Sequence, residues 1–149
     1  MALTNLNKDN TGKKIDTRAR KFLKKDKLDY AHGTGHGVGF FLNVHEGPQS
    51  ISKYNSIKIE KGMILSNEPG FYKKNYFGIR IENLLYVKNK DNNLRFKNLT
   101  MVPIEKDLIN YSLLNKAEKN YLFKYHLSIY SEYSRFLNKK ERKWLASHI

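Results

Sequence analysis

Three of the five histidines fall within one short, glycine-rich stretch of the chain. They are His32, His36 and His45, and a glycine stands on each side of the second. Imidazole nitrogens bind divalent metals and exchange protons near neutral pH, and glycines let backbone and ligands approach closely because they carry no Cβ. The stretch indicates a metal or acid–base site, although a histidine pair in a loop can also be structural or incidental.

Two glutamates follow at positions where a carboxylate charge needs a compensating cation or metal ion. Glu68 ends an apolar segment, which is a costly place for an unpaired carboxylate and therefore favours a nearby metal or cation over a simple turn cap. Glu82 lies in the segment 78–84, where strand alternation puts it on the same face as Arg80. The alternative for Glu82 and Arg80 is a solvated face of neighbouring charges.

The apolar pattern predicts the elements that must position these side chains. Helical spacing predicts a helix over residues 13–26, and the glycine-rich composition of 30–48 predicts a loop with short extended pieces. Strands are expected over 63–68 and 77–87, which can pair as a hairpin, and a third strand is expected over 94–102.

The last part of the sequence has a helical pattern. Asn115 and Glu118 are spaced as an N-cap and its reciprocal partner, and a shorter closing helix is expected over 139–149. The first of these helices carries an apolar stripe, which favours a packing face over a surface that stacks on nucleic-acid bases. The stripe consists of Tyr121, Leu122, Tyr125, Ile129, Tyr133, Phe136 and Leu137.

Composition narrows the classes of protein. Cysteine is absent, which excludes disulfides, thiolate nucleophiles and cysteine-bound zinc, so any metal must bind histidine and carboxylate. No apolar run approaches the roughly 20 residues of a membrane span, and the N-terminus has no export signal, so we expect a cytoplasmic protein without a membrane partner.

The net charge of +14 would suit a polyanionic partner. Lysine and arginine are, however, dispersed along the chain, which favours a solvated basic surface. We therefore expect no specific nucleic-acid partner.

Four motifs in order and at matching spacing resemble one family. They are residues 30–39 (YAHGTGHGVG), 43–48 (NVHEGP), 62–72 (GMILSNEPGFY) and 78–84 (GIRIENL), with a weaker match at 99–104. This set resembles the C-terminal part of the Xaa-Pro aminopeptidases, or aminopeptidases P, of the pita-bread metallopeptidases that include prolidase, methionine aminopeptidase and creatinase.

The resemblance implies an α+β fold, the C-terminal half of a pita-bread (creatinase/aminopeptidase) fold with an antiparallel sheet and packed helices. Residues 1–105 would then form the C-terminal portion of the catalytic domain. Residues 106–149 would form a helical extension that packs on it or on a partner.

The resemblance also implies a dinuclear site. His36 and Glu68 would bind one divalent ion and Glu82 would bridge two, with manganese expected and cobalt or zinc possible. His32 and His45 would lie near the substrate and assist proton transfer, and Glu68 would accept and donate the proton of the attacking water. Arg80 would orient the carboxylates. The implied substrate is a peptide with proline at its second position, from which the N-terminal residue is removed.

The family's two aspartate ligands lie upstream of the histidine segment and have no counterpart here. The upstream aspartates are Asp9, Asp16, Asp26 and Asp29, and none are spaced as the family's pair is. We therefore expect the chain to be incomplete and inactive alone, to bind one ion weakly, and to need a missing upstream half or a homodimer partner. The alternatives are a noncatalytic pita-bread binding module and a gene remnant.

Overall fold

The computed structural model describes residues 5–6, 10–41, 43–90 and 93–149 of the chain. It divides into two compact units, Met1–Thr100 and Met101–Ile149. The first combines one long helix with antiparallel strands, and the second is helical, so the predicted α+β class is confirmed. The predicted assignment of 1–105 and 106–149 to a catalytic portion and an extension stays a prediction.

Helix α1 (Gly12–Lys25) matches the predicted helix to within one residue at each end. It begins where the hydroxyl of Thr11 accepts a hydrogen bond from the Lys14 amide, which satisfies one of the free donors of the first turn. Its inner face is more polar than the sequence suggested, because Asp16 and Arg20 are buried beside Ile15.

The main sheet of the first unit is antiparallel. It consists of β1 (Asn5–Leu6), β4 (Ile64–Asn67), β7 (Asn83–Lys90) and β8 (Asn93–Asn98) in the order β1-β8-β7-β4. Strand β8 ends earlier than predicted, and beyond it the hydroxyl of Thr100 accepts from the amide of Leu84. The core on this sheet consists of Leu6, Ile15, Ile51, Ile59, Leu65, Leu85, Val87 and Phe96, with Met63 and Leu94 packed against them.

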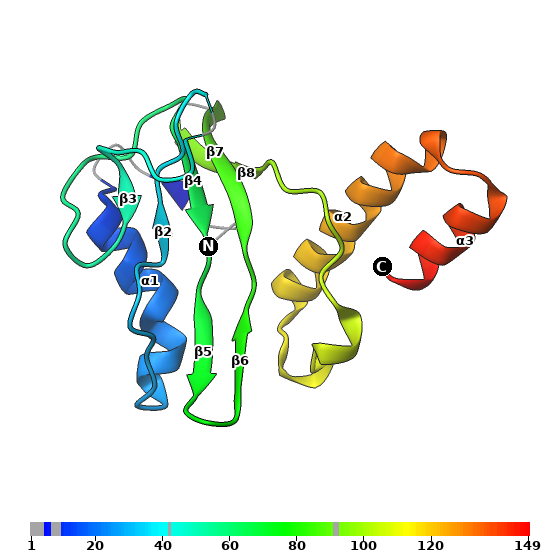
Figure 1. Cartoon of the computed structure of the whole chain (residues 1–149), viewed down its shortest axis with the longest axis horizontal. Coiled ribbons are helices and arrows are strands. Elements are labelled where there is room, and N and C mark those ends of the chain that lie inside the picture. The colour runs from blue at the N-terminus through cyan, green and yellow to red at the C-terminus, as the bar shows by residue number, and fades with distance from the viewer. Residues whose placement is uncertain (1–4, 7–9, 42, 91–92) are drawn as a thin grey trace. The chain divides into compact units, whose positions relative to one another are not determined.

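The predicted hairpin is present, but each of its strands is divided in two. Strand β4 is followed by β5 (Gly70–Lys73), and β6 (Phe77–Arg80) is followed by β7, so that two long extended segments run side by side (Figure 1). Strand pairing stops at positions 68–69 on one segment and 81–82 on the other. Pro69 has no amide hydrogen to give to the ladder, which accounts for the break on the first segment.

The register is the same on both sides of the break. Asn67 pairs with Asn83 before it, and Gly70 pairs with Arg80 after it. Position 68 therefore lies opposite position 82, although neither belongs to a strand. The prediction that Glu82 lies inside a strand is wrong, because the strand is interrupted at this position.

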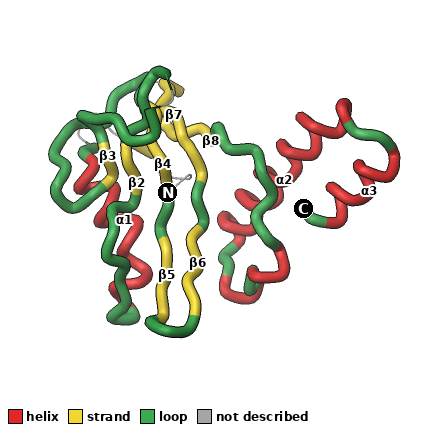
Figure 2. Tube along the Cα trace, in the orientation of Figure 1, coloured by secondary structure: helices red, strands yellow, loops and turns green. Residues whose placement is uncertain are grey.

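The segment between α1 and β4 is mostly loop, as predicted (Figure 2). It contains only the short antiparallel pair β2 (Gly35–His36) and β3 (Ser50–Ile51), apart from position 42, which lies outside the described residues. Strand β2 also lies against β4, where Gly37 bridges to Leu65. A Cβ at Gly35 would overlap the carbonyl oxygen of Ser66, so this close approach requires glycine.

The second unit contains α2 (Lys116–Tyr133) and α3 (Lys139–Ser147), with short 3-10 turns at Lys106–Leu108, Tyr111–Leu113 and Ser134–Phe136. Both helices begin with a capping box, and the one on α2 uses the predicted pair of asparagine and glutamate. In the described part of the chain, no helix combines the length and the apolar character needed to cross a membrane.

The apolar stripe predicted on α2 is only partly buried. Tyr125 and Ile129 are buried, whereas Tyr133 and Phe136 are 41% and 70% exposed. Phe136 leaves the helical phase because α2 ends at Tyr133 and a 3-10 turn follows. The buried cluster of this unit is Tyr125, Ile129 and Leu145, with Met101, Ile104, Tyr130, Leu137 and Ile149 against it.

Candidate metal centre

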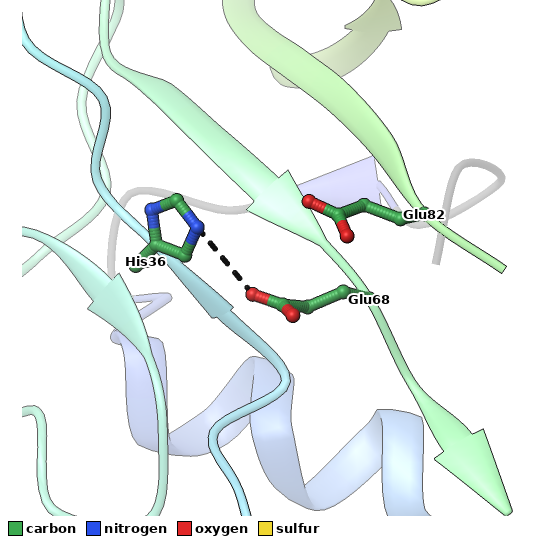
Figure 3. Close-up of side chains that lie close together, drawn as sticks. All are labelled: His36, Glu68 and Glu82. Atoms are coloured by element: carbon green, nitrogen blue, oxygen red, sulfur yellow. Dashed lines mark ion pairs between the residues drawn. The ribbon is translucent and has the colours of Figure 1, made fainter. Parts of the chain in front are cut away.

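The break in the hairpin brings two carboxylates together with one imidazole. Glu68 and Glu82 project from the two interrupted segments, and His36 projects from β2 (Figure 3). One ligand atom from each of these residues lies within 4.8 Å of the others. These are the three side chains that the sequence proposed as metal ligands, and that role stays a prediction.

The imidazole of His36 is oriented by the backbone. Its Nδ1 lies 3.0 Å from the carbonyl oxygen of Gly37, so Nδ1 carries the proton and donates it there. The other nitrogen, Nε2, lies 3.5 Å from Oε1 of Glu68 and is the ring atom left to bind a metal. A ligating histidine typically has this arrangement, in which a carbonyl fixes the tautomer.

Ser66 links the histidine to the carboxylate. Its hydroxyl oxygen accepts a hydrogen bond of 2.8 Å from the His36 amide, and the hydroxyl donates to Oε1 of Glu68 at 3.0 Å. Because Ser66 lies in β4, the sheet itself holds His36 and Glu68 in register. The side chains of Glu68 and His36 are 13% and 22% exposed, so solvent screens them only in part.

Arg80 supplies the nearby positive charge. Its guanidinium lies 3.5 Å from Oε2 of Glu68, and its Nε donates to the hydroxyl of Tyr72 at 2.9 Å. The hydrogen bond with Tyr72 raises the pKa of Arg80, and the carboxylates of Glu68 and Glu82 add to this rise. The expectation that Arg80 orients the carboxylates stays a prediction.

The remaining two predicted residues, His32 and His45, each contact a residue of this group or one bound to it. His32 places its Nε2 2.8 Å from the Tyr72 hydroxyl, which also accepts from Arg80, so Tyr72 donates to His32. His45 lies edge-on to His36, with the ring centroids 4.2 Å apart. The structure thus connects His32 to the centre through Tyr72 and His45 through ring contact.

Sequence reasoning missed several residues that support the centre. Tyr72 and Ser66 were quoted only within a motif, and Asp16 was considered only as an unmatched upstream aspartate. The spacing of Asp16 and Arg20, four apart on a helix with apolar neighbours, is a signal that could have found this buried pair. Asp9, also considered as an unmatched aspartate, lies outside the described residues.

The donor set fits a divalent cation. An imidazole nitrogen and two carboxylates converge, and this mixture of nitrogen and oxygen donors suits manganese, cobalt or zinc. A water molecule or a lysine could not balance two carboxylates facing each other as fully as a doubly charged ion does. Among the described residues, Arg80 is the only arginine or lysine within ion-pair distance of Glu68.

Comparison with known proteins agrees with this fold. A model of metallopeptidase family M24 matches residues 1–89, and a model of the C-terminal region of the same peptidases matches residues 92–149. The chain belongs to metallopeptidase family M24.

Similar proteins are named as peptidases. A probable Xaa-Pro aminopeptidase P of Coprinopsis cinerea is 47% identical over 148 residues, which cover 91% of this chain and 24% of that protein. An uncharacterised peptidase of Schizosaccharomyces pombe is 45% identical over 152 residues, which cover 95% of this chain and 25% of the relative.

A solved structure matches both the sequence and the fold. The X-prolyl aminopeptidase of Caenorhabditis elegans, described as a cytosolic enzyme with a di-nuclear active site, is 40% identical, with a TM-score of 0.90. The match covers 99% of this chain and 26% of that enzyme. The predicted pita-bread fold is thereby confirmed, and the chain spans about a quarter of the length of the relatives it matches.

Proposed function

We propose that this chain forms part of a metal-dependent aminopeptidase that removes the N-terminal residue from peptides with proline at the second position. The observation that carries the proposal is the convergence of His36, Glu68 and Glu82 at the break in the hairpin. The names of the most similar relatives supply the reaction and the substrate class.

In this proposal His36 and Glu68 bind one divalent ion, and Glu82 bridges to a second. Manganese is the expected metal, with cobalt and zinc as the alternatives. When bound, the ions would activate a water nucleophile and polarise the peptide carbonyl. Residues 1–105 would contribute to the catalytic domain, and a further segment or a second copy of the chain would supply the remaining ligands.

The chain's own residues then have separate tasks. Glu68, which is mostly buried, accepts the proton of the attacking water and returns it to the leaving amine. Arg80 keeps the Glu68 carboxylate oriented from 3.5 Å. His32 and His45 lie near the substrate and assist proton transfer, and His32 is held for this by its hydrogen bond to Tyr72.

A peptide substrate follows from the names of the same relatives. The dispersed charge and the lack of a long apolar run support the proposal of no specific nucleic-acid partner and no membrane partner. A cytoplasmic location is proposed because the C. elegans relative is described as a cytosolic enzyme.

A chimera tests the proposed function directly. This chain replaces the matching quarter of the C. elegans enzyme, and release of the first residue from an Xaa-Pro peptide is measured. We expect turnover, and we expect Glu82→Gln to reduce kcat by at least about 100-fold because a ligand charge is lost. Glu60→Gln is the matched control, since Glu60 is an exposed carboxylate of the same unit.

Two results would overturn the proposal. A folded chimera that fails to release the first residue would show that this chain does not complete such a site. Equal loss in Glu82→Gln and Glu60→Gln would show that Glu82 has no special role in the reaction.

A further inference from the structure

A buried ionic cluster lies between α1 and the loop that carries the histidines. The Arg20 cluster consists of Asp16, Arg20, Asp29, Tyr30 and Thr34. Asp16 is 1% exposed, Arg20 5% and Thr34 0%, so most of the cluster is removed from water. The metal ligands assigned above do not include any of these residues.

All three nitrogens of the Arg20 guanidinium are used. Nε donates to Oδ2 of Asp16 at 2.8 Å, and one terminal nitrogen donates to Oδ1 of Asp29 at 2.6 Å and to the carbonyl of Tyr30 at 2.7 Å. The other terminal nitrogen donates to the carbonyl of His32 at 2.6 Å. The guanidinium also lies 3.9 Å over the ring of Tyr30.

Asp16 extends the cluster to the other end of the loop. Its Oδ1 accepts a hydrogen bond of 2.7 Å from the Thr34 hydroxyl, which is also in contact with the hydroxyl of Tyr30. The carbonyl of Thr34 in turn accepts from the amide of Glu68 at 2.8 Å. One helix therefore holds the backbone at His32 and, through Thr34, the backbone at Glu68.

Stability alone does not explain this arrangement. A buried ion pair is weak support for stability, because a packed apolar pair of similar volume often does as well or better. Two of the acceptors of Arg20 are, moreover, main-chain carbonyls of Tyr30 and His32, which an apolar side chain cannot hold. A lysine carries the same charge, but it lacks the planar fork that reaches several acceptors at fixed angles.

We propose that Arg20, together with Asp16, is a positioning residue for the metal centre. It fixes the loop at His32 and, through Thr34, fixes Glu68, so that Glu68 and His36 stay at ligand distance and His32 stays against Tyr72. This inference rests on the proposed function, since it assigns the cluster to the same centre.

The first test compares Arg20→Lys with Arg18→Lys in the 149-residue chain. Arg18 is an exposed arginine of the same helix, so it controls for the change of residue type. Titration calorimetry with Mn²⁺ should show about tenfold weaker binding in Arg20→Lys, in the range found when groups that orient ligands are altered. Arg18→Lys should bind Mn²⁺ as the wild type does.

A second pair of variants separates positioning from folding. Thr34→Val removes the hydroxyl that donates to Asp16 and keeps the shape, whereas Thr34→Ser keeps the hydroxyl. Thr34→Val should weaken Mn²⁺ binding about threefold to tenfold, and Thr34→Ser should restore it. If Arg20→Lys does not fold, this pair of Thr34 variants still tests whether the cluster positions the metal centre.

A metal-free measurement distinguishes failure of this inference from failure of the proposed function. Long-range ¹H–¹⁵N spectra of the histidine rings report whether Nε2 of His32 accepts a hydrogen bond, as its contact with Tyr72 requires. That signal should change in Arg20→Lys and Thr34→Val and persist in Arg18→Lys. If the wild type binds no Mn²⁺, the proposed metal centre fails, and the spectra alone decide the role of Arg20.

One pattern of results would overturn the inference. In that pattern, Thr34→Val and Arg20→Lys lower the melting temperature, but the Mn²⁺ affinity and the His32 signal keep their wild-type values. The cluster would then be a folding element without influence on the centre.

Discussion

Replacing Gly35 by alanine should damage both the fold and the metal centre. Gly35 begins β2, directly before His36, and lies against β4. An alanine Cβ would overlap the carbonyl oxygen of Ser66 and would lie 2.8 Å from its carbonyl carbon and 3.2 Å from its hydroxyl oxygen. Two of these three atoms belong to the backbone, so no side-chain rotation can relieve the overlap.

The size of the effect follows from this geometry. Forcing an extra methyl group into such a packed contact costs about 1–3 kcal/mol. For a unit of this size, 1 kcal/mol shifts the melting temperature by about 4–8 °C, so Gly35→Ala should lower it by roughly 5–20 °C. Mn²⁺ affinity should fall as well, because Ser66 holds both the His36 amide and the Glu68 carboxylate.

Gly33→Ala is the matched control. Gly33 lies two residues earlier in the same loop, and a Cβ there would meet its nearest atom, the carbonyl oxygen of Ile51, at an ordinary 3.5 Å. Thermal unfolding and Mn²⁺ calorimetry should therefore separate the two variants clearly. If Gly33→Ala and Gly35→Ala melted and bound Mn²⁺ alike, the close approach of β2 to β4 would not be what holds His36 in place.

Three further outcomes are expected. Without metal, Glu82→Gln should melt at a higher temperature than the wild type, because one of two facing carboxylates is neutralised. With excess Mn²⁺ the variant should melt at a lower temperature than the wild type. If the variant were the more stable, or the less stable, under both conditions, the metal assignment would be contradicted. With manganese, cobalt or zinc, the 149-residue chain alone should release no residue from an Xaa-Pro peptide above background, because its described residues bring together only three donors. Robust turnover by the purified chain would refute this expectation. Burial lowers the pKa of His126, whose Nε2 accepts from the Ile104 amide, so the unfolded chain takes up a proton more readily. The contribution of His126 to the stability of the second unit should thus be fully present above a pH of about 6.5 and should decrease as the pH falls below this value. Thermal unfolding at several pH values should show no such loss in His126→Gln.

Much of the fold was predictable from local patterns. The capped helix at 12–25 and the capping box at Asn115 follow from spacing and cap chemistry, which act over a few residues. The two breaks in the hairpin were not predicted, because the apolar alternation continues through them and only Pro69 marks the interruption. Strand patterns report the faces of a segment, but they do not report where pairing stops.

The candidate site was predictable for residues with unusual chemistry and not for those that hold them. His36 was found because imidazole binds metals and lies here in a glycine-rich stretch, and Glu68 because a carboxylate that ends an apolar segment is costly without a partner. Tyr72 was missed because an aromatic residue on a strand is ordinary in composition, and its role depends on a partner forty positions away, His32. Contacts of this length cannot be read from local periodicity.

The register of the hairpin explains why a cation belongs at the break. Because pairing resumes in the same register after the interruption, Glu68 and Glu82 face each other as a like-charged cross-strand pair, which is destabilising in a sheet. Repulsion between two such charges a few ångströms apart is of order 1–3 kcal/mol in a partly screened setting. Arg80 offsets part of it at 3.5 Å from Glu68, and Nε2 of His36 lies at the same distance from that carboxylate. A multiply charged cation would attract all three donors at once, which is why we place the proposed metal at the break in the hairpin.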